Sequence, residues 1–258
     1  MHATAQFLAN LRAKNERVSM LPADLHPADL AAAYAVQKDL VSELCSTSGS
    51  DAVGYKIALS SPTAQALCNV THPVYARLIG LNVYESGVVL EAEGFGTRII
   101  EVEFGFRLCA DVPREAGEQS STSIREFVDL VYPSIEIVDH HYGALEDMTA
   151  EAIIADNGIH GAWVYGAPVA AGDDLADVAT ALHLNGQQHL TGAGNRTLGD
   201  PWAAMAWLAN TLHEHGSLLK AGDQVTTGLT TDGVYDAKAG DEVIGDFGAL
   251  GTVSVQFT

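Results

Sequence analysis

The chain has 258 residues, of which 47% are hydrophobic, so it can bury a large core as one domain or as one domain with a smaller lobe. Thirteen basic residues against 33 acidic ones give a net charge of −20, which repels phosphate backbones and anionic lipids and predicts neither a nucleic acid nor a membrane partner. Three widely spaced cysteines indicate neither a disulfide framework nor a zinc cluster, and no signal peptide or 18-residue apolar run occurs. We therefore expect a cytoplasmic protein.

The first part of the chain is predicted to be helical. Phe7, Leu8 and Leu11 mark one amphipathic segment, and "LHPADLAAAYAVQKDLVSEL" predicts a second, with Pro27 at its first helical position. The small polar stretch "CSTSGSDAV" then interrupts the pattern. The sequence thus predicts an N-terminal helical lobe over residues 1–50 and a β-rich domain over residues 51–258.

Beyond this boundary, short apolar runs alternate with Gly, Asn, Asp and Pro, which is typical of strands and turns. Asn185 and Gly186 predict a hairpin with a type I′ turn. Two helices are expected between the strands: one over "STSIREFVDLV", where Ser123 and Glu126 have capping-box spacing, and one over "GDPWAAMAWLANTLHEHG", where Asp200 is the N-cap. The predicted fold class is α+β with a mixed β-rich core.

Acidic residues interrupt two of the apolar strands. In "TRIIEVEFGFRL", residues 97–108, strand alternation puts Glu101 and Glu103 on one face, and "YPSIEIVD" carries Glu136 between two isoleucines. A solvent-facing position would explain each acid equally well. If the three carboxylates converge, their oxygens select a hard cation, Mg²⁺ or Mn²⁺, whereas zinc would require His or Cys.

Lys56 is the next unusual residue, in "VGYKIALSSP". Its neighbours Tyr55 and Ile57 point to the opposite face, so its ammonium group either lies near the interior of the sheet or reaches the surface along its aliphatic stem. Beside a bound anion it would supply a binding charge or a proton.

The segment "IIADNGIHGAWVYG" contains a predicted tight turn. Asp156 and Asn157 are typical turn residues whose side chains bond their own backbone. His160 follows the turn, where it either contacts substrate or is a buried histidine with protein partners.

Six segments occur together in an order that resembles the 2-keto-4-pentenoate hydratase and 4-oxalocrotonate decarboxylase family, within the fumarylacetoacetate hydrolase superfamily. They are "GYKIALSS", "PVYARL", "IEVEFGFRL", "PSIEIVD", "IADNG" and "AGDQVTTG…AGDEVIGDFGALGTVSVQF". The likeness runs from about residue 5 to the C-terminus. It implies a β-rich core like the C-terminal domain of fumarylacetoacetase, preceded by a helical lobe.

The resemblance also implies roles for particular residues. Glu101, Glu103 and Glu136 are expected to bind Mg²⁺ or Mn²⁺, since they match the family's Glu-x-Glu pair and third glutamate. Lys56 matches the lysine of the "GxK" segment, and with His160 it is expected to be catalytic.

Asp156 and Asn157 are expected to bind the substrate, a small 2-keto acid. The chain also departs from the family pattern, because His140 and His141 replace a common Ser-Arg after "EIVD", and Gly158-Ile159 replace Ala-Ser after "ADN". The lost arginine and serine would each have supplied a polar contact.

The implied activity is that of a metal-dependent hydratase, which adds water to a 2-hydroxy-dienoate or 2-keto-4-enoate and yields a 4-hydroxy-2-keto acid in aromatic meta-cleavage degradation. The alternatives are a 4-oxalocrotonate-type decarboxylase, an acylpyruvate C–C hydrolase, or a non-catalytic partner of a decarboxylase. The Glu–His dyad usual in such hydrolases is not evident near residues 12–30, where His26 is the one candidate. A homo-oligomer, and association with a pathway decarboxylase, are also expected.

Overall fold

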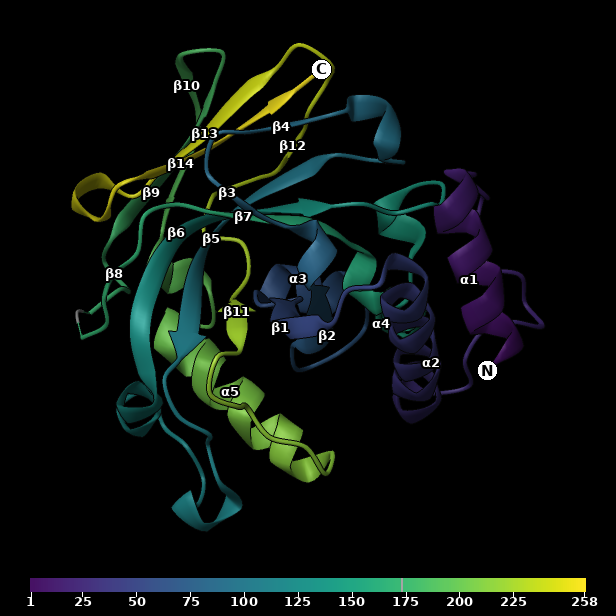
Figure 1. Ribbon diagram of the computed structural model, residues 1–258, viewed down its shortest axis with the longest axis horizontal. Helices are drawn as coiled ribbons and strands as arrows, with labels where there is room; N and C mark the ends of the chain where they lie inside the picture. Colours follow the sequence, from purple (N-terminus) through teal and green to yellow (C-terminus); the bar gives the residue numbers. More distant parts are fainter. Residues whose placement is uncertain (173) are drawn as a thin grey trace.

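We describe the protein from a computed structural model that covers residues 1–172 and 174–258. In this part of the chain the strands form a nine-stranded and a five-stranded sheet, with helices packed around them (Figure 1). The combination confirms the predicted α+β class. The larger sheet has the order β2-β1-β11-β5-β6-β7-β3, and β12 and β8 pair with β5 and β6. Its strands are β1 (Ala52–Ala58), β2 (Val74–Ile79), β3 (Val83–Glu85), β5 (Ile99–Leu108), β6 (Val128–Val138), β7 (His160–Tyr165), β8 (Val169–Ala170), β11 (Gln224–Thr226) and β12 (Tyr235–Asp236).

The smaller sheet has the order β10-β9-β13-β14-β4. Its strands are β4 (Val88–Leu90), β9 (Ala179–Leu184), β10 (Gln187–Ala193), β13 (Glu242–Asp246) and β14 (Thr252–Phe257). The predicted hairpin joins β9 to β10, and Asn185 and Gly186 have φ values of 52° and 78°, as a type I′ turn requires.

Helices cover one end of the molecule and one side of the larger sheet (Figure 1). They are α1 (Ala3–Lys14), α2 (Leu30–Ser48), α3 (Pro62–Leu67), α4 (Ala150–Ala155) and α5 (Pro201–Glu214). As predicted, Asp200 caps α5, because its side chain accepts a hydrogen bond from the Trp202 amide. Pro27 is not the first residue of α2. The helix begins at Leu30, where the Asp29 carboxylate caps the Ala32 amide instead.

The prediction of a helix over "STSIREFVDLV" is wrong. Residues Ser123–Phe127 form a short 3₁₀ turn, and β6 begins at Val128. The capping box does not form, since the Ser123 hydroxyl donates to the Gln119 side chain. The apolar residues of this segment pair with β5 instead, so tertiary pairing overrides the local helical signal.

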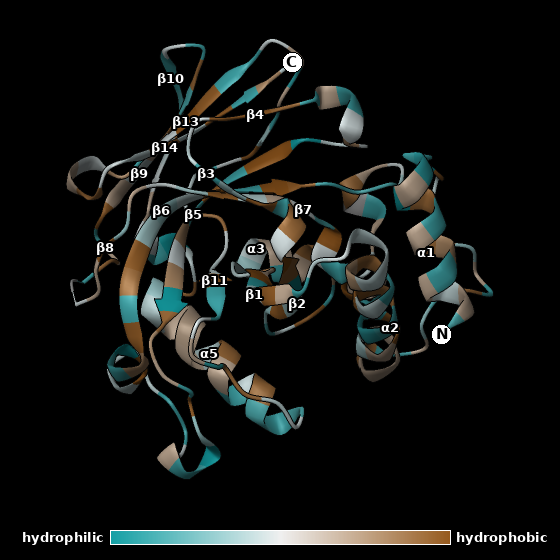
Figure 2. Cartoon of the chain, viewed as in Figure 1, coloured by the Kyte–Doolittle hydropathy of each residue, from teal (hydrophilic) through white to brown (hydrophobic). Residues whose placement is uncertain are grey.

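Two main apolar clusters form most of the core of the described residues, beside a minor third one of Leu78, Tyr132 and Trp163. The larger one lies between the two sheets and α5, where Phe106 meets Trp202 edge to face at 4.7 Å. The smaller one joins α1 and α2 to α4 and to the ends of β5 and β6, including Ile99 and Val138. Figure 2 shows hydrophobic residues along β6 and β7.

The helical segment ends close to the predicted boundary, with α2 ending at Ser48 and Gly49 adopting φ 67° beyond it. Its helices share the smaller apolar cluster with the β-rich part, and a division into two domains at residue 50 stays a prediction. None of the helices in the described ranges has the length and hydropathy needed to span a bilayer.

Candidate active site

Strand register brings the three predicted glutamates together. Glu101 on β5 lies directly opposite Glu136 on β6, and Glu103 lies two residues along β5 on the same face. One carboxylate oxygen from each side chain lies within 4.8 Å of the others. Glu103 and Glu136 are fully buried, whereas Glu101 is partly exposed. The explanation in which these acids face solvent is therefore excluded for Glu103 and Glu136.

Each buried carboxylate has one bonded oxygen and one without a partner. Glu103 Oε2 accepts hydrogen bonds from the Thr226 hydroxyl and from the Gly228 amide at 2.8 Å. Glu103 Oε1 and Glu136 Oε2 are buried and have no hydrogen-bond partner in the described part of the chain. A buried acceptor left unpaired costs about 1–3 kcal/mol, so these two oxygens fit a missing cation. Carboxylate oxygens are the ligands that hard divalent cations prefer.

Burial and mutual repulsion perturb the carboxylates unequally. Burial raises the pKa of Glu103 well above its ordinary value, and the neighbouring carboxylates Glu136 and Glu101 raise it further. Burial also raises the pKa of Glu101. Burial acts in the same direction on Glu136, but the Lys56 ammonium group and the His160 ring overcome it and hold the Glu136 pKa below its ordinary value. A divalent cation would favour the ionised form of all three.

Lys56 lies inside the molecule. Its position on β1, beside Thr226 of β11, points the side chain toward the glutamates, and its exposed fraction is 1%. The Nζ atom lies 2.6 Å from Glu136 Oε1 and donates to the Gly158 carbonyl at 2.8 Å. The alternative in which Lys56 reaches the protein surface is therefore excluded.

His160 begins β7 and contacts the same carboxylate oxygen as Lys56. Its Nδ1 atom lies 3.0 Å from Glu136 Oε1, while its Nε2 atom is buried without a hydrogen-bond partner in the described part of the chain. Burial lowers the pKa of the ring, although the hydrogen bond to Glu136 opposes this. One nitrogen of the ring is therefore fixed and the other is available.

Asp156 and Asn157 have protein partners in the turn before β7. The Asp156 carboxylate accepts from Arg12 Nε at 2.7 Å. Asn157 bonds the main chain of Arg77 in both directions, accepting from its amide and donating to its carbonyl, each at 2.9 Å. Substrate contact by these two residues stays a prediction.

Three consecutive residues in this turn are left-handed. Asn157, Gly158 and Ile159 have φ values of 50°, 63° and 52°. This conformation is unusual for a β-branched residue such as Ile159, and strained backbone of this kind is found most often at functional sites. A side chain on Gly158 would place its Cβ 2.7 Å from that of Ala76, so a residue larger than glycine would displace the carbonyl that binds Lys56.

The two histidines that depart from the family pattern are buried just after the end of β6. The His140 amide donates to the Thr97 hydroxyl, and its ring accepts weakly from the Tyr142 amide at 3.4 Å. Burial lowers the pKa of His141 to about 4, and its Nδ1 atom has no hydrogen-bond partner in the described ranges. His141 is therefore neutral near pH 7 and does not replace the charge of an arginine.

Several residues of the site were missed by sequence reasoning. Thr226, Gly228 and the Gly158 carbonyl hold charged groups of the site, and Arg12 fixes the turn before β7. Thr226 and Gly228 lie in the tail segment "DQVTTG", and its part in the family resemblance was the only signal for them. His26 bonds the Pro27 carbonyl and the Thr149 hydroxyl, at 3.0 Å each.

A cavity of about 100 Å³ reaches the site. Lys56 and Glu101 line it, together with the left-handed residues Gly158 and Ile159. Much of the remaining wall is aliphatic, contributed by Leu59, Ile99, Val138, Leu145, Ile153 and Leu229. The cavity thus combines two charged side chains with a largely apolar wall.

No protein-family model matches the sequence. Among similar proteins, 2-hydroxyhexa-2,4-dienoate hydratase of Comamonas testosteroni is 33% identical over 215 residues, which is 82% of this chain and 80% of that protein. The 2-oxo-hept-4-ene-1,7-dioate hydratase of Escherichia coli is 28% identical over 98% of this chain and 96% of its own length. The structure of 4-oxalocrotonate decarboxylase from Pseudomonas putida G7, complexed with magnesium and adipate, is 26% identical, with a TM-score of 0.90 over 99% of this chain and 96% of that one.

The two-sheet fold is that of the fumarylacetoacetate hydrolase superfamily. Within it, the chain belongs to the 2-keto-4-pentenoate hydratase and 4-oxalocrotonate decarboxylase family, because its likeness to a hydratase exceeds 30% identity over four fifths of the chain. The resemblance inferred from the six sequence segments is thereby confirmed.

Proposed function

We propose that this protein is a divalent-metal-dependent hydro-lyase that hydrates a 2-hydroxy-dienoate, or its 2-keto-4-enoate form, to a 4-hydroxy-2-keto acid. The observation that carries the proposal is the cluster of Glu101, Glu103 and Glu136 within 4.8 Å, next to a buried lysine. Hydratases among the relatives support the reaction class, and their substrate names place it in aromatic-compound catabolism.

Mg²⁺ or Mn²⁺ is the cation we assign to Glu101, Glu103 and Glu136. When bound there, it would hold the substrate's carboxylate and 2-oxygen and stabilise the negative charge that develops during the reaction. Oxygen-only ligands favour both ions over zinc. A magnesium complex of the similar decarboxylase supports the first of them.

Lys56 and His160 are assigned the proton-transfer and binding roles. The Lys56 ammonium group lines the cavity, where it can bind the substrate's carboxylate or give a proton to the substrate. His160 orients Glu136 through Nδ1 and keeps Nε2 for a proton or a water molecule. The Gly158 carbonyl fixes the direction of the lysine.

The cavity wall favours a substrate with an apolar tail. Lys56 is the only Lys or Arg among the described residues that line the cavity, and much of the rest of the wall is aliphatic. A dioate would leave its second carboxylate against that wall, which is costly without a cationic partner. This supports a monocarboxylic dienoate over a dioate.

Decarboxylation of a 4-oxalocrotonate-type acid is the second candidate, since a decarboxylase structure superimposes with a TM-score of 0.90. The two activities are separated by supplying purified protein and Mg²⁺ or Mn²⁺ with each acid. Metal-dependent loss of dienol absorbance with 2-hydroxypenta-2,4-dienoate supports the hydratase. Release of carbon dioxide from 4-oxalocrotonate, without loss of the dienol, would support the decarboxylase instead.

Two further assignments accompany this function. We infer that the protein works in the cytoplasm as a homo-oligomer, and that it can associate with a pathway decarboxylase. Metal binding without turnover of any 2-keto acid would favour a non-catalytic partner role.

Hydrolysis of an acylpyruvate is disfavoured, because His26 bonds a carbonyl and a threonine rather than a glutamate.

A further inference from the structure

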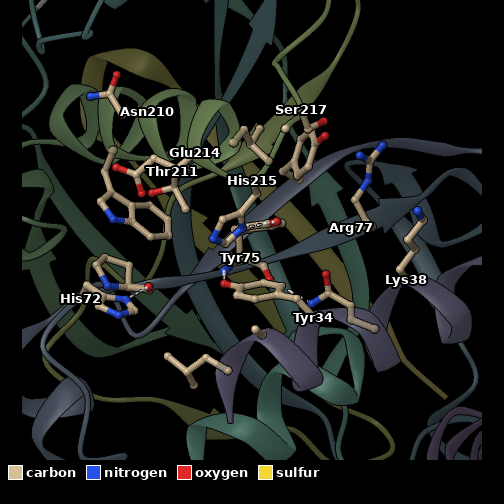
Figure 3. Close-up of a pocket in the computed structure, with 18 of the residues that line it drawn as sticks. Tyr34, Lys38, His72, Tyr75, Arg77, Asn210, Thr211, Glu214, His215 and Ser217 are labelled. Atoms are coloured by element: carbon tan, nitrogen blue, oxygen red, sulfur yellow. Dashed lines mark hydrogen bonds between the residues drawn. The ribbon is translucent and has the colours of Figure 1, made fainter. Parts of the chain in front are cut away.

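A second, larger hollow lies away from the glutamate cluster. It measures about 1200 Å³ and is bounded by α2, the strand pair β1–β2 and α5 (Figure 3). Residues paired across antiparallel strands point to the same face, so Tyr55 and Arg77 share one face of the strand pair, while Lys56 and Ala76 share the other. The hollow, which we call the α2–α5 groove, is therefore separated from the catalytic site by the thickness of the sheet.

Aromatic rings form one wall of the groove. Tyr34 and Tyr75 stack with ring centroids 4.6 Å apart, and the Tyr75 hydroxyl bonds His215 Nδ1 at 2.9 Å. Figure 3 shows these three side chains gathered in the middle of the groove. Because their own hydrogen bonds hold them in place, the three rings present a preformed aromatic wall, in which His215 is inclined by 66° to Tyr34 and by 47° to Tyr75. Such a wall suits an aromatic or conjugated ligand, which can pack on the rings in stacked or edge-to-face contacts.

Arg77 supplies a positive charge that has no carboxylate in direct contact in the described part of the chain, although the charge of Asp223 acts on it from farther away. Its guanidinium carbon lies 4.0 Å from the centroid of the Tyr55 ring, and its Nε atom is buried without a hydrogen-bond partner. In the described part of the chain, no carboxylate oxygen lies within 4.0 Å of its side-chain nitrogens, although the chain has 33 acidic residues. A buried donor left unpaired is costly, so this group is suited to an anionic ligand.

Charges on the groove wall set the orientation of such a ligand. Lys38 of α2 also lines the groove and has no carboxylate within 4.0 Å in the described ranges, and Figure 3 shows it on the same side as Arg77. The acids Glu118 and Glu214 line the groove as well, and neither pairs with Arg77. An anion is therefore attracted to the Arg77 side and repelled by the two glutamates.

We propose that the α2–α5 groove binds a planar aromatic or conjugated carboxylate. The carboxylate lies on Arg77, and the flat body of the ligand packs on Tyr75, Tyr34 and His215. The volume of about 1200 Å³ leaves room for two fused rings, which bury more apolar surface than one ring and are therefore held better. This site is distinct from the metal cluster and does not depend on the proposed reaction.

Binding is tested by titrating 2-naphthoate into the full chain, freed of metal with a chelator, and following heat and tyrosine chemical shifts. Three other probes serve as comparisons: benzoate, uncharged 2-naphthamide and non-planar cyclohexanecarboxylate. We expect 2-naphthoate to bind most tightly, and Arg77→Met to weaken it about tenfold or more. Arg107→Met, which removes an exposed arginine paired with Asp129, is the matched control and leaves binding unchanged.

Glu103→Gln distinguishes the groove from the metal site, because it alters the glutamate cluster and leaves the groove intact. The proposal requires equal 2-naphthoate binding by Glu103→Gln and wild type, and an unchanged rise in melting temperature on adding Mn²⁺ in Arg77→Met. Binding lost in Glu103→Gln but kept in Arg77→Met would overturn it. So would an absence of binding at millimolar probe, or a change in sedimentation of Arg77→Met, which would indicate that a second copy of the chain covers the groove.

Discussion

Single side chains at the centre of the site differ in how their charge is balanced. Lys56 lies 2.6 Å from Glu136, whereas Glu103 has a hydroxyl and an amide donor but no Lys, Arg or His nitrogen within 4.0 Å in the described ranges. A lone buried carboxylate is costly in a low-dielectric interior. A divalent cation supplies the missing charge, and this makes Glu103 the residue most sensitive to substitution.

Glu103→Gln should abolish metal-dependent turnover and leave the fold intact. The change keeps the side chain's size and removes the negative charge that holds the cation. We expect the rise in melting temperature on adding Mn²⁺ to disappear with the activity. Glu91→Gln, at an exposed position, is the control and should behave as wild type. Full activity in Glu103→Gln would show that the ligand assignment is wrong.

Lys56→Met should slow turnover while metal affinity is largely kept. The lysine contacts Glu136 and the Gly158 carbonyl, so its loss removes a positive charge from the cavity without removing a ligand oxygen. Leaving Glu136 with a single partner is expected to cost about 3 kcal/mol of stability in the metal-free protein. Turnover, Mn²⁺ affinity and urea unfolding are measured together. Unchanged turnover would remove Lys56 from the catalytic role.

The residues that could be predicted from the sequence are those whose chemistry conflicts with their surroundings. Four charged residues stand inside apolar strands, and this conflict can be seen in the amino-acid sequence itself. They are Glu101, Glu103, Glu136 and Lys56. Arg12 has no such signal, because a basic residue on an amphipathic helix resembles a surface residue. Its partner Asp156 lies 144 positions away, a separation that no local pattern spans.

At the scale of elements, the N-terminal helix α1 holds the turn that precedes β7. Arg12 donates to the Asp156 carboxylate at 2.7 Å and to the carbonyls of Asp156 and His160 at 3.0 Å each. Three donors of one planar group thus fix both ends of a strained left-handed segment. The segment in turn directs the Gly158 carbonyl to Lys56, so α1 supports the active site through the backbone of this turn and of His160.

Arg12→Ala is expected to lower the free energy of unfolding by about 3 kcal/mol, because it leaves Asp156 buried and unpaired. Lys14→Ala, at an exposed position of the same helix, should change it by less than about 0.5 kcal/mol. Urea unfolding of the two variants measures the difference. Equal stabilities would mean that α1 is not coupled to the turn.

Asp156 also predicts a pH dependence of stability. Burial raises its pKa to about 6, even though Arg12 opposes the shift. Since the folded protein keeps this proton to a higher pH than the unfolded chain, the contribution of Asp156 to the free energy of unfolding falls as pH rises from about 4 to about 6. Asp156→Asn should lack this fall. Its free energy of unfolding, measured relative to wild type, should therefore rise by on the order of 2 kcal/mol over this pH range.

Urea unfolding at several pH values across this range measures that difference. Asp24→Asn, at an exposed position, provides the baseline. A constant difference between Asp156→Asn and wild type from about pH 4 to about pH 6 would contradict the raised pKa.

Elements with strong local signals were predictable, and those decided by tertiary pairing were not. The Asn185-Gly186 hairpin and the Asp200 cap follow from turn and capping chemistry alone. The segment after Ser123 has helical spacing but pairs with β5, so it is a strand from Val128 onward. The start of α2 was missed because both Pro27 and Asp29 offer plausible N-terminal signals.

At the scale of the whole molecule, the site depends on strand pairings that are distant in sequence. β11 lies between β1 and β5, parallel to the first and antiparallel to the second, and so brings Thr226 between Lys56 and the glutamates. The α+β class was predictable from composition and from the Gly, Asn, Asp and Pro residues between the apolar runs, whereas this strand order was not. Residues that share a face of one strand can be read from alternation, but the order of strands requires the packed core.

The most direct test of the glutamate site is anomalous diffraction from crystals soaked with Mn²⁺ and oxalate, which stands in for the 2-keto acid. The account predicts one strong manganese peak among the carboxylates of Glu101, Glu103 and Glu136, with oxalate completing its coordination on the Lys56 side. A peak elsewhere, with these three carboxylates free of metal, would contradict it.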